Sequence, residues 1–446
     1  MNTSAYPFVE GSFWLTPPNN IQPSLQGAER CDVVIVGGGY TGLCAALRLR
    51  EKGVDVALVE QGFCGSGASG RNAGHVTPTI GKDVPTCIKK FGVQRGLAFV
   101  RFAEQAIEHF EHLITKYDID CDYQRTGNII AGVHEKQRKA LYDNLQRVSH
   151  LGVKMRFLDE AAMQERGLPS AFKFGVLEDC GGTIHPGKYV LGLREAALAA
   201  GVRIYEQSAV THIEEGSSVV VHTQQGTLTA EQMLLATNAY GPAQLGLLKS
   251  KTLPVRVSLF VTRPLTTAER NSIDWQGQEG VYTAHELLEN YRITPDGRIL
   301  GGSKVINYAY GSKLANGYQP ESFQLLERTF RERFPTLGNI PIECYWGGWI
   351  AMTFDFMPVM GRLGKHKNIM YYAGCNGHGI PQCSMMGGVM AEEILGGKTA
   401  EVELFQHLRM PMPPEPLRWS ALHAINGYLA QRDRKIDKLV AHAASL

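Results

Sequence analysis

CDVVIVGGGYTGLCAALRL, residues 31–49, is the segment from which the architecture of this chain can be worked out. The β-branched run Cys31–Val36 suits a strand that is buried on both faces of a sheet. A glycine turn follows, and the apolar positions of residues 43–49 suit a helix packed on that sheet. A second strand, residues 55–59, ends at Glu60. Strand, turn, helix and strand together predict one parallel βαβ unit.

The glycine turn, GGGYTG, satisfies the pattern G-x-G-x-x-G between a strand and a helix. Gly37 permits the tight turn, Gly39 lets the backbone approach a pyrophosphate, and Gly42 lets the helix lie close to the sheet. The pyrophosphate would meet the unpaired N–H groups at the start of the helix. Glu60, eighteen residues beyond Gly42, would accept hydrogen bonds from ribose hydroxyls. The alternative is a tight turn that binds no ligand.

Residues 65–75, GSGASGRNAGH, form a loop of small residues directly after the acidic strand end. Such a loop lets backbone N–H groups crowd against a large flat ligand, which a bare NAD enzyme does not need. The loop therefore favours FAD over NAD. The alternative is a flexible surface loop.

Beyond this unit the pattern alternates between strands and helices. Short strands are expected within 201–240, 279–303 and 341–351, and helices within 99–114, 384–396 and 417–446, the last interrupted at Gly427. This order predicts a mixed α/β protein whose nucleotide-binding domain is discontinuous, with a second domain inserted.

Composition excludes several classes of function. The 446 residues are 44% hydrophobic and 20% charged with a formal net charge of +2, so neither nucleic acid nor a membrane surface is expected as the main partner. The nine cysteines form no C-x-x-C pair, which favours reduced thiols and no metal site. With no signal peptide and no apolar run of about 18 residues, a cytoplasmic protein is expected.

The motifs at residues 31–49 and 65–75 resemble the D-amino-acid-oxidase/glycine-oxidase-like FAD-dependent oxidoreductase superfamily. Within it they are most similar to gamma-glutamylputrescine oxidases and less so to monomeric sarcosine oxidases. Further similar segments are GGTIHPGKYV (181–190), LLATNAYG (234–241), DFMPVMGRL (355–363) and YYAGCNGHGIPQCSMMGG (371–388).

The resemblance implies a Rossmann-type FAD-binding domain with an inserted antiparallel-sheet substrate domain. It assigns residues 1–85, 156–245 and 341–446 to the first and 86–155 and 246–340 to the second. The cofactor-binding residues expected from the glycine pattern and the resemblance are Gly37, Gly39, Tyr40, Thr41, Gly42, Glu60, Gln61, Ser66, Ala68, Ser69, Arg71, Asn72, Ala73, Gly74, His75, Val210, Thr237, Asn238, Gly377, His378, Gly379 and Ile380.

Three positions bear on chemistry through comparison with sarcosine oxidase. Gly348 stands where that enzyme has the cysteine that ties its flavin, so the FAD should be non-covalent. Pro381 stands where it has a lysine that grips the substrate carboxylate, which favours an amine over a small α-amino acid. Lys304 aligns with the lysine beside flavin N5, where a cation would favour electron transfer to oxygen. The alternative for Lys304 is an ordinary exposed lysine.

The function implied is an FAD-dependent amine oxidase of the gamma-glutamylputrescine type. Hydride would pass from the carbon next to the amine nitrogen to flavin N5, the imine would hydrolyse to an aldehyde or ketone, and O2 or another acceptor would take the electrons. One alternative is an oxidase or dehydrogenase of a cyclic or N-methyl amino acid, with Arg71 or another cation binding the carboxylate. Another is a non-catalytic FAD-bound subunit.

The expected catalytic residues are His378 and Lys304. The residues expected to line the substrate pocket are His75, Tyr291 and Trp349, with packing roles as the alternative.

Overall fold

The βαβ unit forms as β1 (Gly27–Val36), α1 (Tyr40–Glu51) and β2 (Val56–Val59), with β1 and β2 parallel. Residues 33–36 and 56–59 are buried, as expected for strands covered on both faces. The computed structural model describes residues 6–241, 248, 250–273, 275–308, 310–313, 317–407 and 412–443.

β1 and β2 lie within an eight-stranded sheet in the order β18-β19-β11-β1-β2-β8, extended by a hairpin of β9 and β10 beside β11. Strands β19, β11, β1, β2 and β8 are mutually parallel, and β18 runs antiparallel at the edge. The parallel core is therefore assembled from three distant parts of the chain. The further strands are β8 (Arg203–Tyr205), β9 (His212–Glu214), β10 (Val219–His222), β11 (Gly226–Leu235), β18 (Val359–Leu363) and β19 (Ile369–Ala373).

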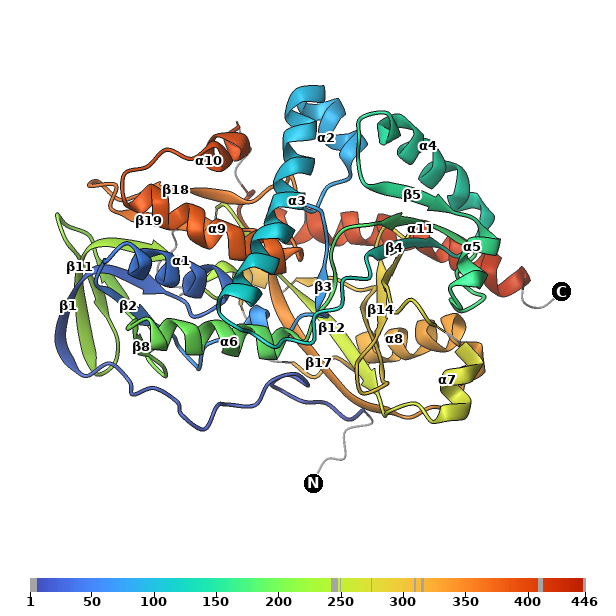
Figure 1. Cartoon of the computed structure of the whole chain (residues 1–446), viewed down its shortest axis with the longest axis horizontal. Helices are drawn as coiled ribbons and strands as arrows, with labels where there is room; N and C mark the ends of the chain where they lie inside the picture. The colour runs from blue at the N-terminus through green and yellow to red at the C-terminus, as the bar shows by residue number, and fades with distance from the viewer. Residues whose placement is uncertain are drawn as a thin grey trace.

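Three helices cover one face of this sheet: α1, α6 (Pro186–Ala199) and α9 (Gly379–Ile394). Figure 1 shows them side by side, with α3 (Val93–Lys116) crossing over them. The backbones of α1 and α9 approach closely, because a Cβ atom on Gly387 would lie 2.6 Å from the carbonyl oxygen of Thr41. This packing brings the starts of α1 and α9 to the same end of the sheet.

The second sheet has nine strands in the order β16-β12-β15-β14-β13-β4-β6-β5, with β17 paired to β12. Most neighbouring strands are antiparallel, and β13 and β4 are parallel. The strands are β4 (Asn128–Gly132), β5 (Met155–Leu158), β6 (Phe174–Glu178), β12 (Leu253–Thr262), β13 (Gly280–Thr283), β14 (Glu289–Ile293), β15 (Ile299–Ser303), β16 (Asn307–Tyr308) and β17 (Ile342–Met352).

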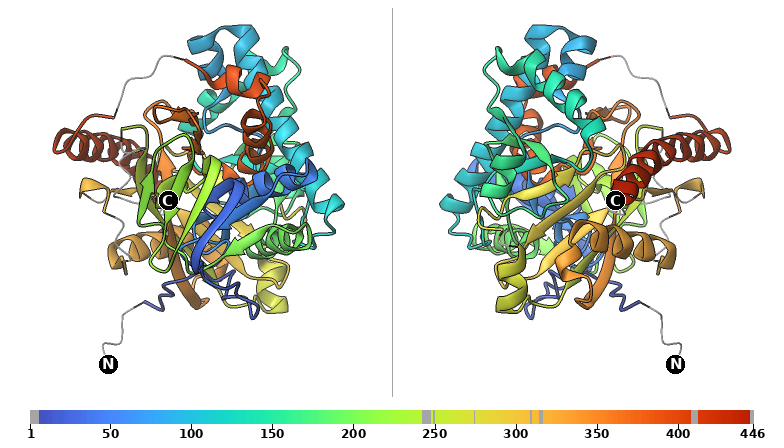
Figure 2. Two further views of the ribbon diagram at one scale, coloured as in Figure 1. Left: turned by 90° about the vertical axis from the view of Figure 1, so that its left-hand side faces the viewer. Right: turned by 90° about the vertical axis from the view of Figure 1, so that its right-hand side faces the viewer.

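Helices surround this second sheet, and the last of them, α11 (Leu417–Ala443), crosses to it from the C-terminal segment. Figure 2 shows α11 in dark red at the side of the molecule. The remaining helices are α2 (Val84–Phe91), α4 (Arg138–Ser149), α5 (Glu160–Glu165), α7 (Thr267–Ile273), α8 (Pro320–Arg333) and α10 (Ala400–Phe405), and the short strands β3 (His75–Val76) and β7 (Gly182–Thr183) pair apart from both sheets.

The structure shows which sheet three strands join and how the tail helix runs. The expected nucleotide-binding domain includes residues 156–178 and 342–352, but β5, β6 and β17 pair within the nine-stranded sheet. Strand composition does not show which sheet a strand will join, because pairing is a long-range property.

The sequence predicts that the tail helix is interrupted at Gly427, but α11 continues through this residue. Packing of the helix against the core compensates for the low helix propensity of one glycine. Residues 444–446 lie outside the described part.

The cysteine side chains and the character of the helices are two further features of the fold. All nine cysteines are buried free thiols. Among the described residues, no helix combines the length and apolar character that a membrane crossing requires.

Candidate active site

A cavity of about 530 Å³ lies between the two sheets, at the carboxyl ends of β1 and β2. The eight-stranded sheet supplies Gly37 and Glu60 to its wall, and the nine-stranded sheet supplies Asn290 and Trp349. Ligands of open α/β sheets bind in this position, because helix N-termini and loops meet at the carboxyl ends of parallel strands.

The glycine turn between β1 and α1 cannot accept larger residues. Gly37 has φ +110°, and its Cβ would lie 2.8 Å from the carbonyl oxygen of Ala236. A Cβ on Gly42 would lie 2.0 Å from the carbonyl oxygen of Gly37. α1 begins after Gly39, which has no side chain to cap it, and the N–H of Tyr40 donates to the Ser69 hydroxyl at 3.1 Å. The N–H groups of Gly39 and Thr41, which also line the cavity, remain available for a ligand.

Glu60 organises the turn as well as lining the cavity. Its two carboxylate oxygens accept hydrogen bonds from the N–H of Gly38 at 2.8 Å and the N–H of Gly62 at 2.9 Å. Burial raises the pKa of Glu60, and these N–H donors oppose that rise. Each oxygen keeps a lone pair that can accept a bond from a ligand hydroxyl.

The loop of residues 65–75 is held in place by hydrogen bonds within the loop and to residues 10 and 347. The Asn72 amide donates to the carbonyl oxygens of Ala68 and Ser69, and its oxygen accepts from the N–H of Gly74. The Arg71 guanidinium donates to backbone carbonyl oxygens of residues 10, 66 and 347. The loop is therefore a fixed wall of the cavity, and the alternative of a flexible surface loop does not apply.

The segment before α9 forms the opposite wall. His378 lies 3.3 Å from the Thr77 hydroxyl through Nδ1, and burial lowers the pKa of His378 to about 4. The imidazole is consequently neutral near pH 7. Residues 377–380 all line the cavity, and α9, like α1, begins without a side-chain cap. Two helix N-termini thus face one cavity.

Four uncharged polar atoms of the cavity lining are buried without a hydrogen-bond partner among the described residues: His75 Nε2, Thr237 Oγ1, Asn290 Oδ1 and Trp349 Nε1. Buried polar groups are normally paired, so these atoms indicate a polar ligand. Nδ1 of His75 lies 3.2 Å from the side-chain oxygen of Asn128. Burial, with the nearby charge of Arg292, lowers the pKa of His75 to about 4, so this ring is also neutral.

Lys304 lines the cavity but is not an ordinary exposed lysine, since it is only 6% exposed. Its ammonium lies 2.9 Å from a Glu289 carboxylate oxygen and 3.3 Å from an Asp437 carboxylate oxygen. Arg333 bridges the same two carboxylates, with both distances 3.0 Å. Two cations and two anions form a compact buried cluster, and Asp437 reaches it from α11.

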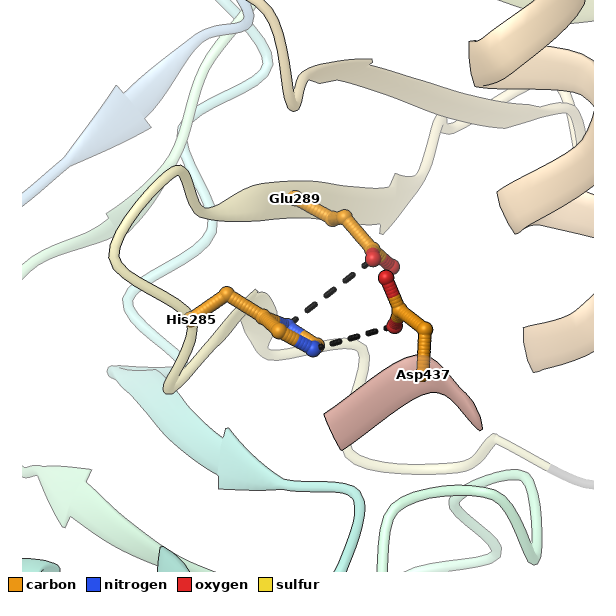
Figure 3. Close-up of side chains that lie close together, drawn as sticks. All are labelled: His285, Glu289 and Asp437. Carbon is orange, nitrogen blue, oxygen red and sulfur yellow. Dashed lines mark ion pairs between the residues drawn. The ribbon is translucent and has the colours of Figure 1, made fainter. Parts of the chain in front are cut away.

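Figure 3 shows His285, Glu289 and Asp437 converging in this cluster, at a separation that could suggest a metal site. The nitrogen atoms of His285 lie 2.8 Å from the Thr283 hydroxyl and 3.3 Å from an oxygen of Asp437. Because Lys304 and Arg333 already balance the carboxylates, the arrangement is an ion-pair cluster and does not indicate a metal.

Most of the residues expected from the sequence meet in this cavity. Gly42 and Ser66 are not in its lining; Gly42 packs against the turn. Tyr291 is 1% exposed in the core of the nine-stranded sheet and donates to Glu289, so it does not wall the pocket. The expected residues that line the cavity are Gly37, Gly39, Tyr40, Thr41, Glu60, Gln61, Ala68, Ser69, Arg71, Asn72, Ala73, Gly74, His75, Val210, Thr237, Asn238, Lys304, Trp349, Gly377, His378, Gly379 and Ile380.

Sequence reasoning missed residues that reach the site from strands and from the tail. Tyr282 and Asn290 line the cavity from β13 and β14, and the Tyr240 hydroxyl in its wall accepts a hydrogen bond from the N–H of Trp349 at 3.1 Å. Asp437 holds Lys304 from a helix far along the chain. No local pattern signals these contacts, because each depends on how distant strands and helices pack.

Comparisons with known proteins agree with this geometry. Residues 32–393 match the family model DAO, described as FAD dependent oxidoreductase. The gamma-glutamylputrescine oxidoreductase of Escherichia coli K12 is 31% identical over 408 residues, covering 90% of this chain and 93% of that protein. The glycine oxidase of Geobacillus kaustophilus is 25% identical over 391 residues, covering 83% and 95%.

Solved structures share the fold. The crystal structure of glycine oxidase from Geobacillus kaustophilus superimposes with a TM-score of 0.73 at 22% identity, covering 85% of this chain and all (100%) of that one. L-proline dehydrogenase from P. horikoshii gives 0.71 at 22% identity, covering 84% and 96%. The chain therefore belongs to the DAO family of FAD-dependent oxidoreductases, enzymes that act on amines and amino acids.

Proposed function

We propose that this chain is an amine oxidase whose substrate carries no carboxylate next to the reacting amine, of the gamma-glutamylputrescine type. The carbon next to the nitrogen loses a hydride, the resulting imine hydrolyses to an aldehyde or ketone, and O2 is reduced to H2O2. The bound FAD supplies the hydride acceptor at flavin N5 and returns the electrons to oxygen.

The residues present fit FAD. The N-termini of α1 and α9 offer unpaired N–H groups, Glu60 offers acceptor lone pairs, and the cavity lining contains buried polar atoms without partners among the described residues. We assign the pyrophosphate to the turn of residues 37–42 and the flavin to the loop of residues 65–75 and residues 377–380. Gly348 lines the cavity and carries no thiol, which supports non-covalent binding.

The observation that carries the substrate proposal is that the cations of the described cavity wall are already paired. Within the described residues, the lysine and arginine side chains that line the cavity are Arg71 and Lys304. Arg71 donates to three backbone carbonyl oxygens, and Lys304 pairs with two carboxylates. An α-amino acid would bury its carboxylate without a partner, at a cost that an amine avoids. Arg71 is consequently a poor candidate for a carboxylate clamp.

The reaction requires little acid–base chemistry from the lining residues. The substrate nitrogen must be neutral, since its lone pair drives loss of the hydride. His75 and His378 are neutral and add no positive charge, and apolar side chains of β12 exclude water. Desolvation then lowers the pKa of the bound amine, which favours its neutral form.

An anaerobic absorption titration of the purified, FAD-loaded chain tests the proposal. The panel is gamma-glutamylputrescine, putrescine, sarcosine, pipecolate, proline and D- and L-amino acids. We expect the oxidised flavin to be bleached by gamma-glutamylputrescine, or by another primary or secondary amine that has no carboxylate next to the reacting nitrogen. H2O2 should then form when air is admitted. Bleaching by pipecolate, proline or sarcosine alone would instead establish a cyclic or N-methyl amino-acid enzyme. No bleaching by any amine would contradict the proposal and favour a non-catalytic subunit.

A further inference from the structure

The cavity of about 530 Å³ described above, to which we assign the flavin, is hereafter called the flavin cavity. A second cavity, of about 950 Å³, adjoins it. The two cavities share wall residues that include Tyr282, Phe356 and His378. Side chains of α3, α4 and α11 form much of the remaining wall of this second cavity, hereafter the side chamber. A substrate with an extended body can therefore place its reacting end in one cavity and the rest in the other.

One buried acid of the side chamber has no cationic partner among the described residues. Glu178, at the end of β6, is 6% exposed, and its carboxylate accepts a hydrogen bond from the Tyr282 hydroxyl. No lysine or arginine of the described ranges forms an ion pair with it. Two neighbouring cations pair elsewhere, Lys154 with Glu104 at 3.4 Å and Arg156 with Asp179 at 3.2 Å. A buried carboxylate without a cation is costly, and a cationic ligand group would remove that cost.

Tyr282 connects this acid to the flavin cavity. Its side chain lines both cavities, and its ring lies edge-on to His75, with ring centres 6.4 Å apart. β13, which carries Tyr282, and β6, which carries Glu178, flank β4 on either side. The hydroxyl is thus fixed by the sheet between the acid and the place where the amine must lie.

We propose that Glu178, acting through the Tyr282 hydroxyl, binds the ammonium group of the substrate and accepts the proton that the amine must lose before oxidation. This inference rests on the proposed amine oxidation. It adds what that proposal lacked, a destination for the proton.

The transfer balances within the chain and the substrate. An N–H bond of the ammonium breaks as an O–H bond forms on the Tyr282 oxygen, while the original O–H bond of Tyr282 breaks and the proton joins a Glu178 oxygen. The products are a neutral amine and a neutral carboxylic acid. Glu178 then releases the proton to water of the side chamber.

The surroundings suit a proton acceptor that works near neutral pH. Burial raises the pKa of Glu178 to about 7, opposed by the bond from Tyr282. A free alkylamine is protonated at that pH, so transfer to Glu178 is needed for a useful population of neutral amine. The other titratable or charged side chains on elements packed against β6 include His75, Arg138, Lys139, Asp143, Arg147, Lys154, Arg156, Glu160, Glu165, Asp179 and Cys180. Those in the chamber wall include Lys82, Asp83, Glu104, Lys136, His285, Glu286, His378, Arg432, Asp433 and Lys435.

The test is the pH dependence of anaerobic flavin reduction by the amine that reduces the wild-type protein. We expect the wild-type rate constant to rise with pH through about 7, where Glu178 loses its proton. Glu178→Gln keeps the shape and still accepts from Tyr282, but cannot take the proton. Its rate at pH 7.5 should fall about 10²-fold and recover toward pH 10, following ionisation of the amine itself. Tyr282→Phe, which keeps the ring, should give the same profile.

Glu104→Gln is the matched control, since it removes a carboxylate from the same chamber without touching Tyr282, and it should keep the wild-type profile. An unchanged profile in Glu178→Gln, or an equal loss at every pH, would overturn the inference and leave amine oxidation standing. A wild-type protein that no amine reduces would contradict both proposals.

A second readout does not depend on turnover. Infrared difference spectra of the protein should be recorded across pH 5–9, a range that spans the pKa of Glu178 at about 7. They should contain the carbonyl band of a buried protonated carboxyl group, and this band should disappear on deprotonation. That band should be missing in Glu178→Gln and present in Glu104→Gln. Its persistence in Glu178→Gln would assign the titration to another residue and contradict the inference.

Discussion

At the scale of single residues, Lys304 is the side chain whose role depends most on its partners. It lies in the cavity to which we assign the flavin, where a cation would assist electron transfer to oxygen, yet two carboxylates share its charge. Together with Arg333, the cluster has no net charge. Because the cluster carries no net positive charge, any electrostatic effect on oxygen depends on how close the Lys304 ammonium lies to the oxygen molecule.

We predict that Lys304→Met lowers the rate constant for reoxidation by O2 about 10²-fold, while anaerobic reduction by the amine is unchanged. Stopped-flow absorption separates the two steps. Asp437→Asn, which leaves the cluster with an excess positive charge, should change the oxygen step in the opposite direction. Removing the lysine also leaves Arg333 to balance both the Glu289 and Asp437 carboxylates, so the free energy of unfolding should fall, by less than the ~3–5 kcal/mol that a wholly unpaired buried charge costs. Unchanged reoxidation in Lys304→Met would disprove the oxygen role.

At the scale of elements, α11 is a structural part of the site although it is the last helix of the described chain. The carboxylate of Asp433 accepts from the N–H groups of Glu286 and Leu287, both at 2.9 Å, and so fixes the loop between β13 and β14. One turn further, Asp437 enters the ion-pair cluster, and residue 436 packs on the core of the nine-stranded sheet. The outer half of α11 carries Gly427, which is exposed, and a Cβ atom added there would meet no other atom within 4 Å.

Two glycine-to-alanine changes should shift the free energy of unfolding in opposite directions, because one glycine lies in open space and the other is tightly packed. Gly427→Ala should raise the free energy of unfolding by about 0.5–1 kcal/mol, since it improves helix propensity in open space. Gly42→Ala should lower it by about 1–3 kcal/mol and weaken FAD binding, since the new Cβ meets the carbonyl oxygen of Gly37. Urea unfolding and flavin fluorescence measure both. Destabilisation by Gly427→Ala would show that α11 is not a continuous helix there.

At the scale of the whole molecule, the cavity exists because two sheets built from interleaved segments face one another. Enclosure between them removes water from His75 and His378, which lowers the pKa of each to about 4. In the unfolded chain, each of these histidines binds a proton near pH ~6.5. Stability from the two neutral histidines is therefore present above pH ~6.5 and is lost as the pH falls toward about 4.

We predict that the free energy of unfolding of the FAD-loaded protein falls more steeply between pH 6.5 and 4.5 in wild type than in a His75→Gln/His378→Gln variant. Glu178, whose pKa is raised to about 7, acts in the opposite sense over this window and is common to both proteins. The difference between the two curves therefore isolates the histidines. Urea unfolding at pH 7.5, 6 and 5 with excess FAD measures it, and parallel curves would contradict the prediction.

The sequence by itself determined the nucleotide-binding half of this protein. The βαβ unit, the glycine turn, Glu60 and the loop of residues 65–75 are local features, in which neighbours along the chain fix the backbone. A tight turn needs glycine, and a helix start needs N–H groups, whatever the rest of the chain does. The same locality explains why the mixed α/β fold and the FAD family followed from short motifs.

Only the tertiary structure decided the substrate side. Strands β5, β6 and β17 join the nine-stranded sheet rather than the nucleotide-binding domain, and Tyr291 packs in the core rather than in the cavity. Lys304 meets Asp437, and Glu178 meets Tyr282, between segments that lie far apart along the chain. The charge and protonation of these groups are set by burial and by partners that folding brings together, and no spacing along the chain encodes either.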